Sequence, residues 1–234
     1  MDADRITRRN LLEGVGIAAA IPAFAMAQTA TQTPSFPKDA AEAVQRLKDG
    51  NVRFAAGKTR HAHESADWRK QLIAGQKPFA TILGCSDSRV PVELIFDQGF
   101  GDLFVIRVAG NVISPDVVGS LAYAMAHLQT PLFVVVGHQG CGAVTAAVQA
   151  LQGPTNELPG IETLLKLIEP GLPKILPGDS FDQQVSAAVE ANVRWYIRQL
   201  AELPGAKKPL ETKQVTLLGA VYDLATGQVR FLPA

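Results

Sequence analysis

Cysteine is scarce in this chain, and neither sign of charge is in excess. Only two of the 234 residues are cysteine, so a fold held together by several disulfide bonds is excluded. The 22 lysines and arginines are balanced by 22 aspartates and glutamates, and there is no basic tract. A nucleic-acid surface requires clustered positive charge to contact the phosphates. The composition therefore argues against nucleic acid as a partner and agrees with a small neutral or singly charged substrate.

The sequence also lacks a hydrophobic run long enough to span a membrane. The apolar run VGIAAAIPAFAMA at 15–27 is too short to cross a bilayer core of ~30 Å as a helix, and it contains Pro22. It follows the basic segment TRRNLLEG at 7–14 and ends in small residues, as a cleavable export signal does. We expect residues 1–27 to be this signal, so that no stable membrane span remains after cleavage.

An arginine pair within the signal predicts the route of export. Arg8 and Arg9, followed by Asn-Leu-Leu, resemble a twin-arginine signal, and that route carries proteins that are already folded. The alternative is an ordinary secretory signal that happens to contain two arginines. Either signal places the protein in the periplasm or otherwise outside the cytoplasm. Residues 28–37, QTATQTPSFP, are expected to form a flexible tether ahead of one folded domain at 38–234.

The folded part of the chain alternates between helical and strand patterns. Helices are expected over 38–57, 65–75, 115–129, 142–152 and 180–203, strands over 79–85, 103–111 and 131–142, and a terminal strand pair over 214–234. Gly50 is expected to break the first helix locally. The first strand is continuously apolar, which suits burial on both faces. The alternation predicts an α/β fold with a mainly parallel β-sheet flanked by helices, and with extended N-terminal helices.

Potential metal ligands follow two of the predicted strands. Cys85 and Asp87 come after the first strand, and His138 and Cys141 come after the third. The carboxyl ends of parallel strands meet at one edge of a sheet, where α/β proteins bind ligands. Two cysteines and one histidine form a set that Zn²⁺ accepts, with a fourth position left for water. Two alternatives are a disulfide between the cysteines and a closed structural zinc site with Asp87 as fourth ligand.

The segments that carry these residues resemble the β-class carbonic anhydrases. GCSDSRVPVE at 84–93 and VVVGHQGCGAV at 134–144 are similar to the two core motifs of that family. LKDGNVRFAAG at 47–57 resembles its N-terminal helix, and RVAGN at 107–111 resembles its segment after the second strand. The resemblance implies a carbonate dehydratase that interconverts carbon dioxide and bicarbonate through a zinc-bound hydroxide. It also implies a homodimer, or an oligomer built from dimers, in which the helices of residues 38–75 wrap the partner.

Roles for individual residues follow from the same resemblance. Cys85, His138 and Cys141 match the family's zinc ligands. Asp87 and Arg89 match its catalytic pair, in which the carboxylate accepts a hydrogen bond from zinc-bound water and the guanidinium holds the carboxylate. Some members close the site by moving the aspartate onto zinc, which would make Asp87 a fourth ligand in that state.

Five further positions are candidates for binding the substrate. They are Gln76, Phe104, Ala109, Tyr123 and Gly142. Gln76 matches a substrate-side amide of the family, and Phe104 and Tyr123 match pocket-lining positions of plant-type members. Structural alternatives exist, because Gln76 could be a solvated turn residue and the two aromatic residues could belong to the core. Ala109 stands where some relatives have a larger aliphatic residue, a difference that would widen or reshape the pocket.

The other histidines are expected to lie at the surface. His61 and His63 are predicted to be exposed near the second helix, with proton relay as the alternative role. His127 is predicted to lie at the surface or at a helix end.

Two expectations concern regulation and pH. Family members that close the site carry a tryptophan three residues before the first cysteine, within a regulatory bicarbonate pocket; this chain has Ile82 there, although Arg107 is in place. We therefore expect an open resting state, with Asp87 paired to Arg89, and hyperbolic kinetics. Two thiolates cancel the charge of Zn²⁺, so hydration should rise with pH and be weak below about pH 7.

Two other functions would use the same ligands. Hydrolases of carbonyl sulfide or carbon disulfide are similar in sequence to this family, and their substrates are linear like carbon dioxide. A non-catalytic zinc-binding or thiol-sensing protein would also need the two cysteines and the histidine. The ligands alone do not distinguish these functions from carbon dioxide hydration.

Overall fold

The computed structural model describes residues 36–154, 156–174 and 178–233. The predicted export signal and most of the predicted tether lie outside these residues. Phe36, at the end of the predicted tether, lies against the rings of His63 and Trp68, with ring centroids 6.3 and 6.4 Å away.

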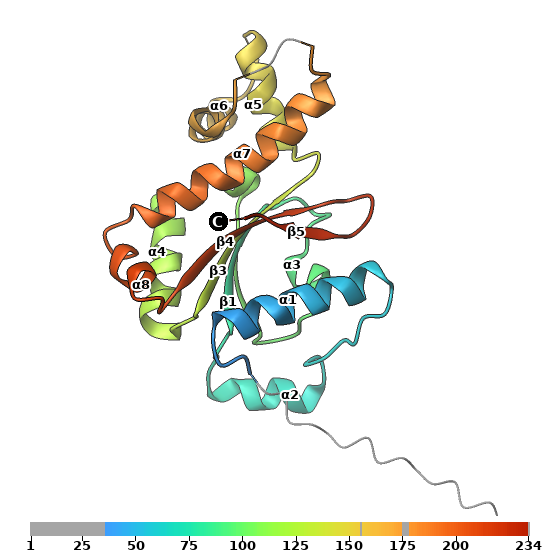
Figure 1. Ribbon diagram of the computed structural model, residues 1–234, viewed down its shortest axis with the longest axis vertical. Coiled ribbons are helices and arrows are strands. Elements are labelled where there is room, and N and C mark those ends of the chain that lie inside the picture. Colours follow the sequence, from blue (N-terminus) through green and yellow to red (C-terminus); the bar gives the residue numbers. More distant parts are fainter. Residues whose placement is uncertain (1–35, 155, 175–177, 234) are drawn as a thin grey trace, which may run out of the picture. The chain divides into compact units, whose positions relative to one another are not determined.

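The core of the fold is a five-stranded sheet with the order β2-β1-β3-β4-β5 (Figure 1). Its strands are β1 (Ala80–Gly84), β2 (Leu103–Arg107), β3 (Leu132–His138), β4 (Thr216–Tyr222) and β5 (Val229–Phe231). All neighbours are parallel except β4 and β5, which are antiparallel. The predicted mainly parallel sheet and the predicted C-terminal strand pair are therefore confirmed.

The order of the strands reverses at β1, and this reversal positions the site. The chain passes from β1 to β2 on one side, and then crosses to β3 on the other side of β1. In open parallel sheets such a switch leaves a crevice outside the carboxyl ends of the two strands concerned. Gly84, the last residue of β1, pairs in register with Val136 of β3. The chain therefore leaves β1 beside the end of β3, which continues for two more residues to His138.

Each face of the sheet contributes to a separate layer of core. Ile82 and Val134 belong to the layer that includes α1 (Ala40–Ala55). Leu83 and Val135 belong to the opposite layer, which includes α4 (Pro115–Tyr123), α5 (Gly142–Gln152) and α7 (Phe181–Ala201). Figure 1 shows α1 and α7 on opposite sides of the sheet. Every residue of β1 is buried, because a central parallel strand is covered on both faces.

The helices extend over most of the predicted segments. They are α1 (Ala40–Ala55), α2 (Ala66–Gln71), α3 (Val92–Ile95), α4 (Pro115–Tyr123), α5 (Gly142–Gln152), α6 (Pro159–Ile168), α7 (Phe181–Ala201) and α8 (Lys207–Glu211). The sequence patterns did not indicate α3, α6 or α8. Among the described residues, no helix combines the length and apolar character that a bilayer crossing requires.

Two predicted boundaries were wrong for backbone reasons. Gly50 does not break α1; the helix continues through it, and a Cβ atom there would lie 1.8 Å from the carbonyl oxygen of Phe96. Glycine at this position therefore permits close packing. The strand predicted over 103–111 ends at Arg107, because Gly110 and Asn111 adopt left-handed φ values of 66° and 58° in the turn Ala109–Asn111 (η2).

Candidate metal centre

Three predicted ligand side chains meet at the crevice between β1 and β3. Cys85 directly follows β1, His138 is the last residue of β3, and Cys141 is the N-cap residue of α5. Their ligand atoms all lie within 4.8 Å of one another. The three residues are 4%, 0% and 3% exposed. The structure therefore assembles the predicted set at one buried point.

The two cysteines are close but not joined. Their Sγ atoms are 3.9 Å apart and both thiols are free, whereas a disulfide bond measures about 2.05 Å. The disulfide between Cys85 and Cys141 is therefore excluded in this structure.

The chemistry of the donor set fits a zinc ion. The Nδ1–H of His138 donates to the carbonyl oxygen of Gln139 at 3.0 Å, which leaves the lone pair on Nε2. That Nε2 atom is buried and has no hydrogen-bond partner among the described residues. A buried polar atom without a partner is costly, and a metal ion at the cluster would supply one. Zn²⁺ prefers thiolate and imidazole ligands in this number.

The two thiols titrate as a pair. The hydrogen bond from Cys141 lowers the pKa of Cys85 to about 4 against the opposing effect of burial, and His138 and the backbone N–H groups of Asp87 and Gly110 assist. The same hydrogen bond, together with burial, raises the pKa of the Cys141 thiol. Cys85 is therefore the thiol that ionises first, and metal binding must displace the proton of Cys141.

Asp87 and Arg89 form a bidentate ion pair beside the cluster. The Nε of Arg89 donates to Oδ1 of Asp87 at 2.9 Å, and its Nη2 donates to Oδ2 at 2.7 Å. These hydrogen bonds hold the pKa of Asp87 well below its usual range. The carboxylate is therefore ionised at any pH of interest.

Arg107 has a role that the sequence did not indicate. Its Nε donates to the carbonyl oxygen of Cys85 at 2.9 Å, and its Nη2 donates to that of Asp87 at 2.6 Å. The guanidinium thereby fixes the loop that presents the ligand and the carboxylate. Ile82, at the position of the regulatory tryptophan, is completely buried in the core.

Two of the predicted substrate-binding residues lie next to the cluster. Ala109 belongs to the turn η2, in which the backbone of Gly110 helps to lower the pKa of Cys85. Gly142 directly follows Cys141 and begins α5.

Three of the predicted substrate-binding residues do not approach the cluster of their own chain. Phe104 pairs in register with Thr81, four residues before Cys85, which is about 13 Å along a strand. The Tyr123 ring lies 6.2 Å from the Phe104 ring and is 47% exposed, so Tyr123 is not a core residue. Gln76 is exposed and precedes β1 by four residues, so it lies toward the edge of the sheet at which the parallel strands begin.

The prediction of an exposed His63 was wrong. Its side chain is 5% exposed, its Nδ1 lies 2.8 Å from Oδ2 of Asp102, and its ring stacks on Trp68 with centroids 4.2 Å apart. The imidazole is buried because it lies within hydrogen-bonding distance of the carboxylate of Asp102, a completely buried residue directly before β2. The same carboxylate accepts a hydrogen bond from Nη2 of Arg46. This position is at the strand starts, away from the ligands.

The other two histidines are at the surface. His61 is exposed, as predicted. His127 is also exposed, and its ring lies 4.9 Å from that of Tyr123.

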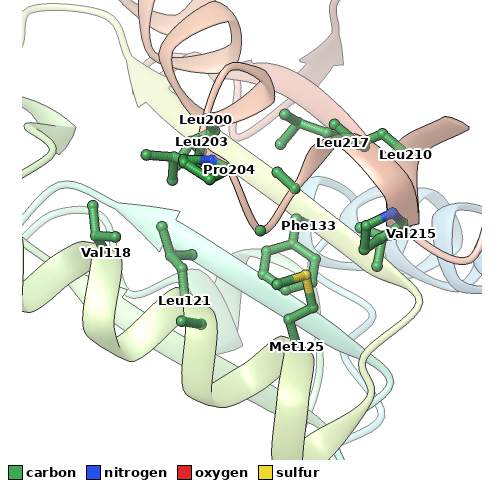
Figure 2. Close-up of a pocket in the computed structure, with 14 residues that line it drawn as sticks. Val118, Leu121, Met125, Phe133, Leu200, Leu203, Pro204, Leu210, Val215 and Leu217 are labelled. Atoms are coloured by element: carbon green, nitrogen blue, oxygen red, sulfur yellow. The ribbon is translucent and has the colours of Figure 1, made fainter.

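A second pocket, with a cavity of about 160 Å³, lies elsewhere in the fold. Figure 2 shows Leu121 and Met125 on one side, Leu203 and Leu217 on the other, and Phe133 between them. None of the described residues that line it is ionisable. This pocket therefore lacks the groups that hydration chemistry requires.

The sheet order, the crevice and the buried Cys-His-Cys cluster define an α/β protein with a candidate metal site. The family model for carbonic anhydrase matches residues 80–229, more than half of the chain. The chain belongs to the carbonic anhydrase family, in its β class, and is a carbonate dehydratase that hydrates carbon dioxide.

Named relatives and solved structures agree with this assignment. Carbonic anhydrase 2 of Mycobacterium tuberculosis is 49% identical over 146 residues, 59% of this chain and 69% of the relative. The carbonic anhydrase of Mycolicibacterium smegmatis is 39% identical over 191 residues, 78% and 88% of the two chains. The β-carbonic anhydrase CcaA superposes with a TM-score of 0.66 at 27% identity, covering 82% of this chain and all of that one. A tetrameric β-carbonic anhydrase from Sordaria macrospora superposes with a TM-score of 0.65 at 25% sequence identity, covering 82% of this chain and 98% of that one.

Proposed function

We propose that this enzyme hydrates carbon dioxide with a zinc ion held by Cys85, His138 and Cys141. The observation that carries the proposal is the buried, unpartnered Nε2 of His138 beside two thiols whose sulfur atoms are 3.9 Å apart. Zinc, when bound, supplies the Lewis acidity that makes hydroxide available as a nucleophile near neutral pH.

The residues of the chain orient the reaction. The ionised Asp87 can only accept hydrogen bonds, so an O–H group near its Oδ2 atom must point its hydrogen at the carboxylate and its lone pair elsewhere. Arg89 holds Asp87 in this orientation through two hydrogen bonds, and Arg107 holds the loop. The small residues Ala109 and Gly142 leave room for a linear substrate beside the ligands. The resting site is open, with Asp87 paired to Arg89 and with hyperbolic kinetics.

The site is completed by a second copy of the chain. Gln76, Phe104 and Tyr123 cannot line the cluster of their own chain, so their proposed contact with the substrate requires a partner subunit. Exposed apolar side chains on the N-terminal helices support this arrangement, since Val52 is 68% and Ile73 is 85% exposed. We expect a homodimer or an oligomer built from dimers, and light scattering after gel filtration measures the mass directly.

The mature enzyme acts outside the cytoplasm. The basic segment, the apolar run at 15–27 and its small-residue end support export, and the pair Arg8 and Arg9 supports the twin-arginine route. N-terminal sequencing of the exported protein should find Gln28 first. Retention of residues 1–27 in the mature protein would contradict the proposal.

The decisive test combines metal content with turnover. Purified protein should contain one zinc per chain and hydrate carbon dioxide in a stopped-flow assay; a chelator should abolish the activity and zinc should restore it. Cys141→Ser should abolish zinc retention. Zinc without hydration would favour a non-catalytic or thiol-sensing function. Turnover of carbonyl sulfide or carbon disulfide in excess of carbon dioxide would favour the hydrolase.

A further inference from the structure

The apolar pocket of Figure 2 is lined by segments from distant parts of the chain. Leu121 of α4 and Met125 of the following π-helical segment η3 line one side, and Leu203, just after α7, lines the other. Phe133 of β3 and Leu217 of β4 lie on the sheet beneath the helices. The pocket is therefore a product of the tertiary fold.

This pocket is separate from the candidate metal centre. Phe133 is the second residue of β3, whereas the ligand His138 is its last residue. Five residues of a strand span about 16 Å. The pocket thus lies toward the edge of the sheet at which the parallel strands begin, and the ligands lie at the opposite edge. A molecule bound in the pocket does not contact the ligands.

The lining offers no partner for a charged or strongly polar molecule. None of the described residues that line the pocket is ionisable, and Pro204 and Pro209 have no N–H to donate. The N–H groups of Ala206, Leu210 and Val215 already donate to backbone carbonyl oxygens, at 2.9, 3.0 and 3.1 Å. An anion such as bicarbonate would lose its hydration here without compensation. The lining therefore favours an uncharged apolar molecule.

The size of the cavity limits the occupant. Its volume is about 160 Å³, and an apolar cavity of about 150 Å³ engineered in another protein stays dry and binds benzene or xenon. Beyond Leu121 and Phe133 a narrower space continues toward Leu83, but it is too small for a water molecule. The pocket therefore accommodates one small molecule and is too small for a peptide helix.

The mouth of the pocket can adjust to an occupant. Ala122 and Gly205 line the pocket and are exposed, which places them at its mouth. A Cβ atom at Gly205 would lie 3.5 Å from Cε of Met125, so the two sides approach each other there. A methionine side chain is unbranched and flexible. Met125 can therefore repack around a ligand without movement of the backbone.

We propose that this pocket is a binding site for a small, uncharged apolar molecule of the size of a single aromatic ring. Burial of the apolar surface of the ligand supplies the affinity. The lining side chains also regain dispersion contacts that an unfilled cavity lacks. The site needs no metal, so zinc-free and zinc-loaded protein should bind the ligand equally. The inference goes beyond the proposed function and does not depend on it.

The test uses toluene as the probe and benzoate as its charged counterpart. Each is titrated into the purified protein, and the methyl groups of leucine, valine and methionine are followed by NMR. Toluene should shift the methyl resonances of Leu121, Met125 and Leu203 in a saturable manner, with a dissociation constant of about 1 mM or tighter. Benzoate has the same ring but carries a carboxylate, so it should not bind at this concentration.

A matched pair of variants locates the binding. Ala122→Phe places a ring at the mouth of the pocket and should weaken toluene binding about tenfold or more. Ala126→Phe is the control, because Ala126 is also exposed, lies four residues further along the same helical segment and does not line the pocket. It should leave toluene binding unchanged. If A122F does not fold, Ala206→Phe fills the pocket from the other side in its place.

The outcomes separate this inference from the proposed function. Shifts that do not saturate, equal weakening in A122F and A126F, or benzoate binding as tight as that of toluene would each overturn it. Toluene binding that is lost as the protein concentration rises would assign the pocket to a subunit interface and would also overturn it. A protein that binds toluene but holds no zinc would overturn the proposed function alone.

Discussion

Oδ2 of Asp87 lies 3.8 Å from Nε2 of His138, although the same carboxylate forms a bidentate pair with Arg89. Asp87 is thus adjacent to the ligand cluster without belonging to it. The separation is too long for a hydrogen bond, and it leaves the carboxylate free to orient a water molecule at the open position.

Removal of the carboxylate should separate metal binding from turnover. Asp87→Ala leaves all three ligands intact, so zinc content should remain at the wild-type level. Turnover should fall about 100-fold or more, because the group that orients the nucleophile is missing. Metal analysis and stopped-flow hydration on the same preparation measure both quantities. Loss of zinc together with activity would instead make Asp87 a ligand.

The pH dependence of turnover should not come from Asp87. Its pKa is lowered by Arg89, so the carboxylate is already ionised well below neutrality and its contribution is lost only in strong acid. We expect hydration to rise with pH and to be weak below about pH 7, because the two thiolates oppose ionisation of water at the metal. A stopped-flow profile that is flat from about pH 6 to 9, without a buffer-limited step, would contradict this account.

An ion pair between α7 and β5 should contribute pH-dependent stability. The hydrogen bond from Arg230 to Glu190, at 2.7 Å, lowers the pKa of that carboxyl in the folded protein, and Arg194 assists. A lowered folded-state pKa stabilises the protein at pH values above the usual glutamate pKa, and this contribution is lost as the pH falls from there through the lowered folded-state pKa. Glu190→Gln should therefore lower the melting temperature near pH 7, and the difference from wild type should shrink as the pH falls below about 4. A constant difference would refute this assignment.

The packing of α1 should not tolerate a methyl group at Gly50. A Cβ atom there would lie 1.8 Å from the Phe96 carbonyl oxygen, so Gly50→Ala should destabilise the protein by about 3 kcal/mol or more. Gly119 is the matched control, since it lies in α4 with no atom within 4 Å of an added Cβ. Gly119→Ala should be neutral or stabilising by up to about 1 kcal/mol. Denaturant unfolding measures both, and equal effects would contradict the packing argument.

Much of the site could be read along the chain because its parts are local in sequence. Cys85 and Asp87 are two residues apart and end one apolar strand, and His138 and Cys141 are three residues apart and end another. Parallel strands deliver their carboxyl ends to one edge, so these two short motifs were sufficient to predict the cluster. The mainly parallel sheet and the C-terminal strand pair followed from the same local periodicity.

Contacts between distant segments could not be read in this way. Nothing near His63 in the sequence indicated that Asp102 would bury it, and nothing near Gly50 indicated the Phe96 carbonyl. Asn192 is a polar residue among the apolar buried residues of α7, but its hydrogen bond to the distant carbonyl oxygen of Gly110 was not predictable.

The amino-acid sequence by itself determined the fold class and the three candidate ligands, since spacing and periodicity act over a few residues, and its resemblance to the β-class carbonic anhydrases indicated the Asp87–Arg89 pair. Only the tertiary structure decided that the thiols remain unbonded at 3.9 Å, and that Arg107 holds the ligand loop. It also decided that Phe104 and Tyr123 lie away from their own metal centre. Those facts depend on how strands and helices far apart in the chain pack together, and packing is set by the shapes of whole surfaces rather than by neighbouring residues.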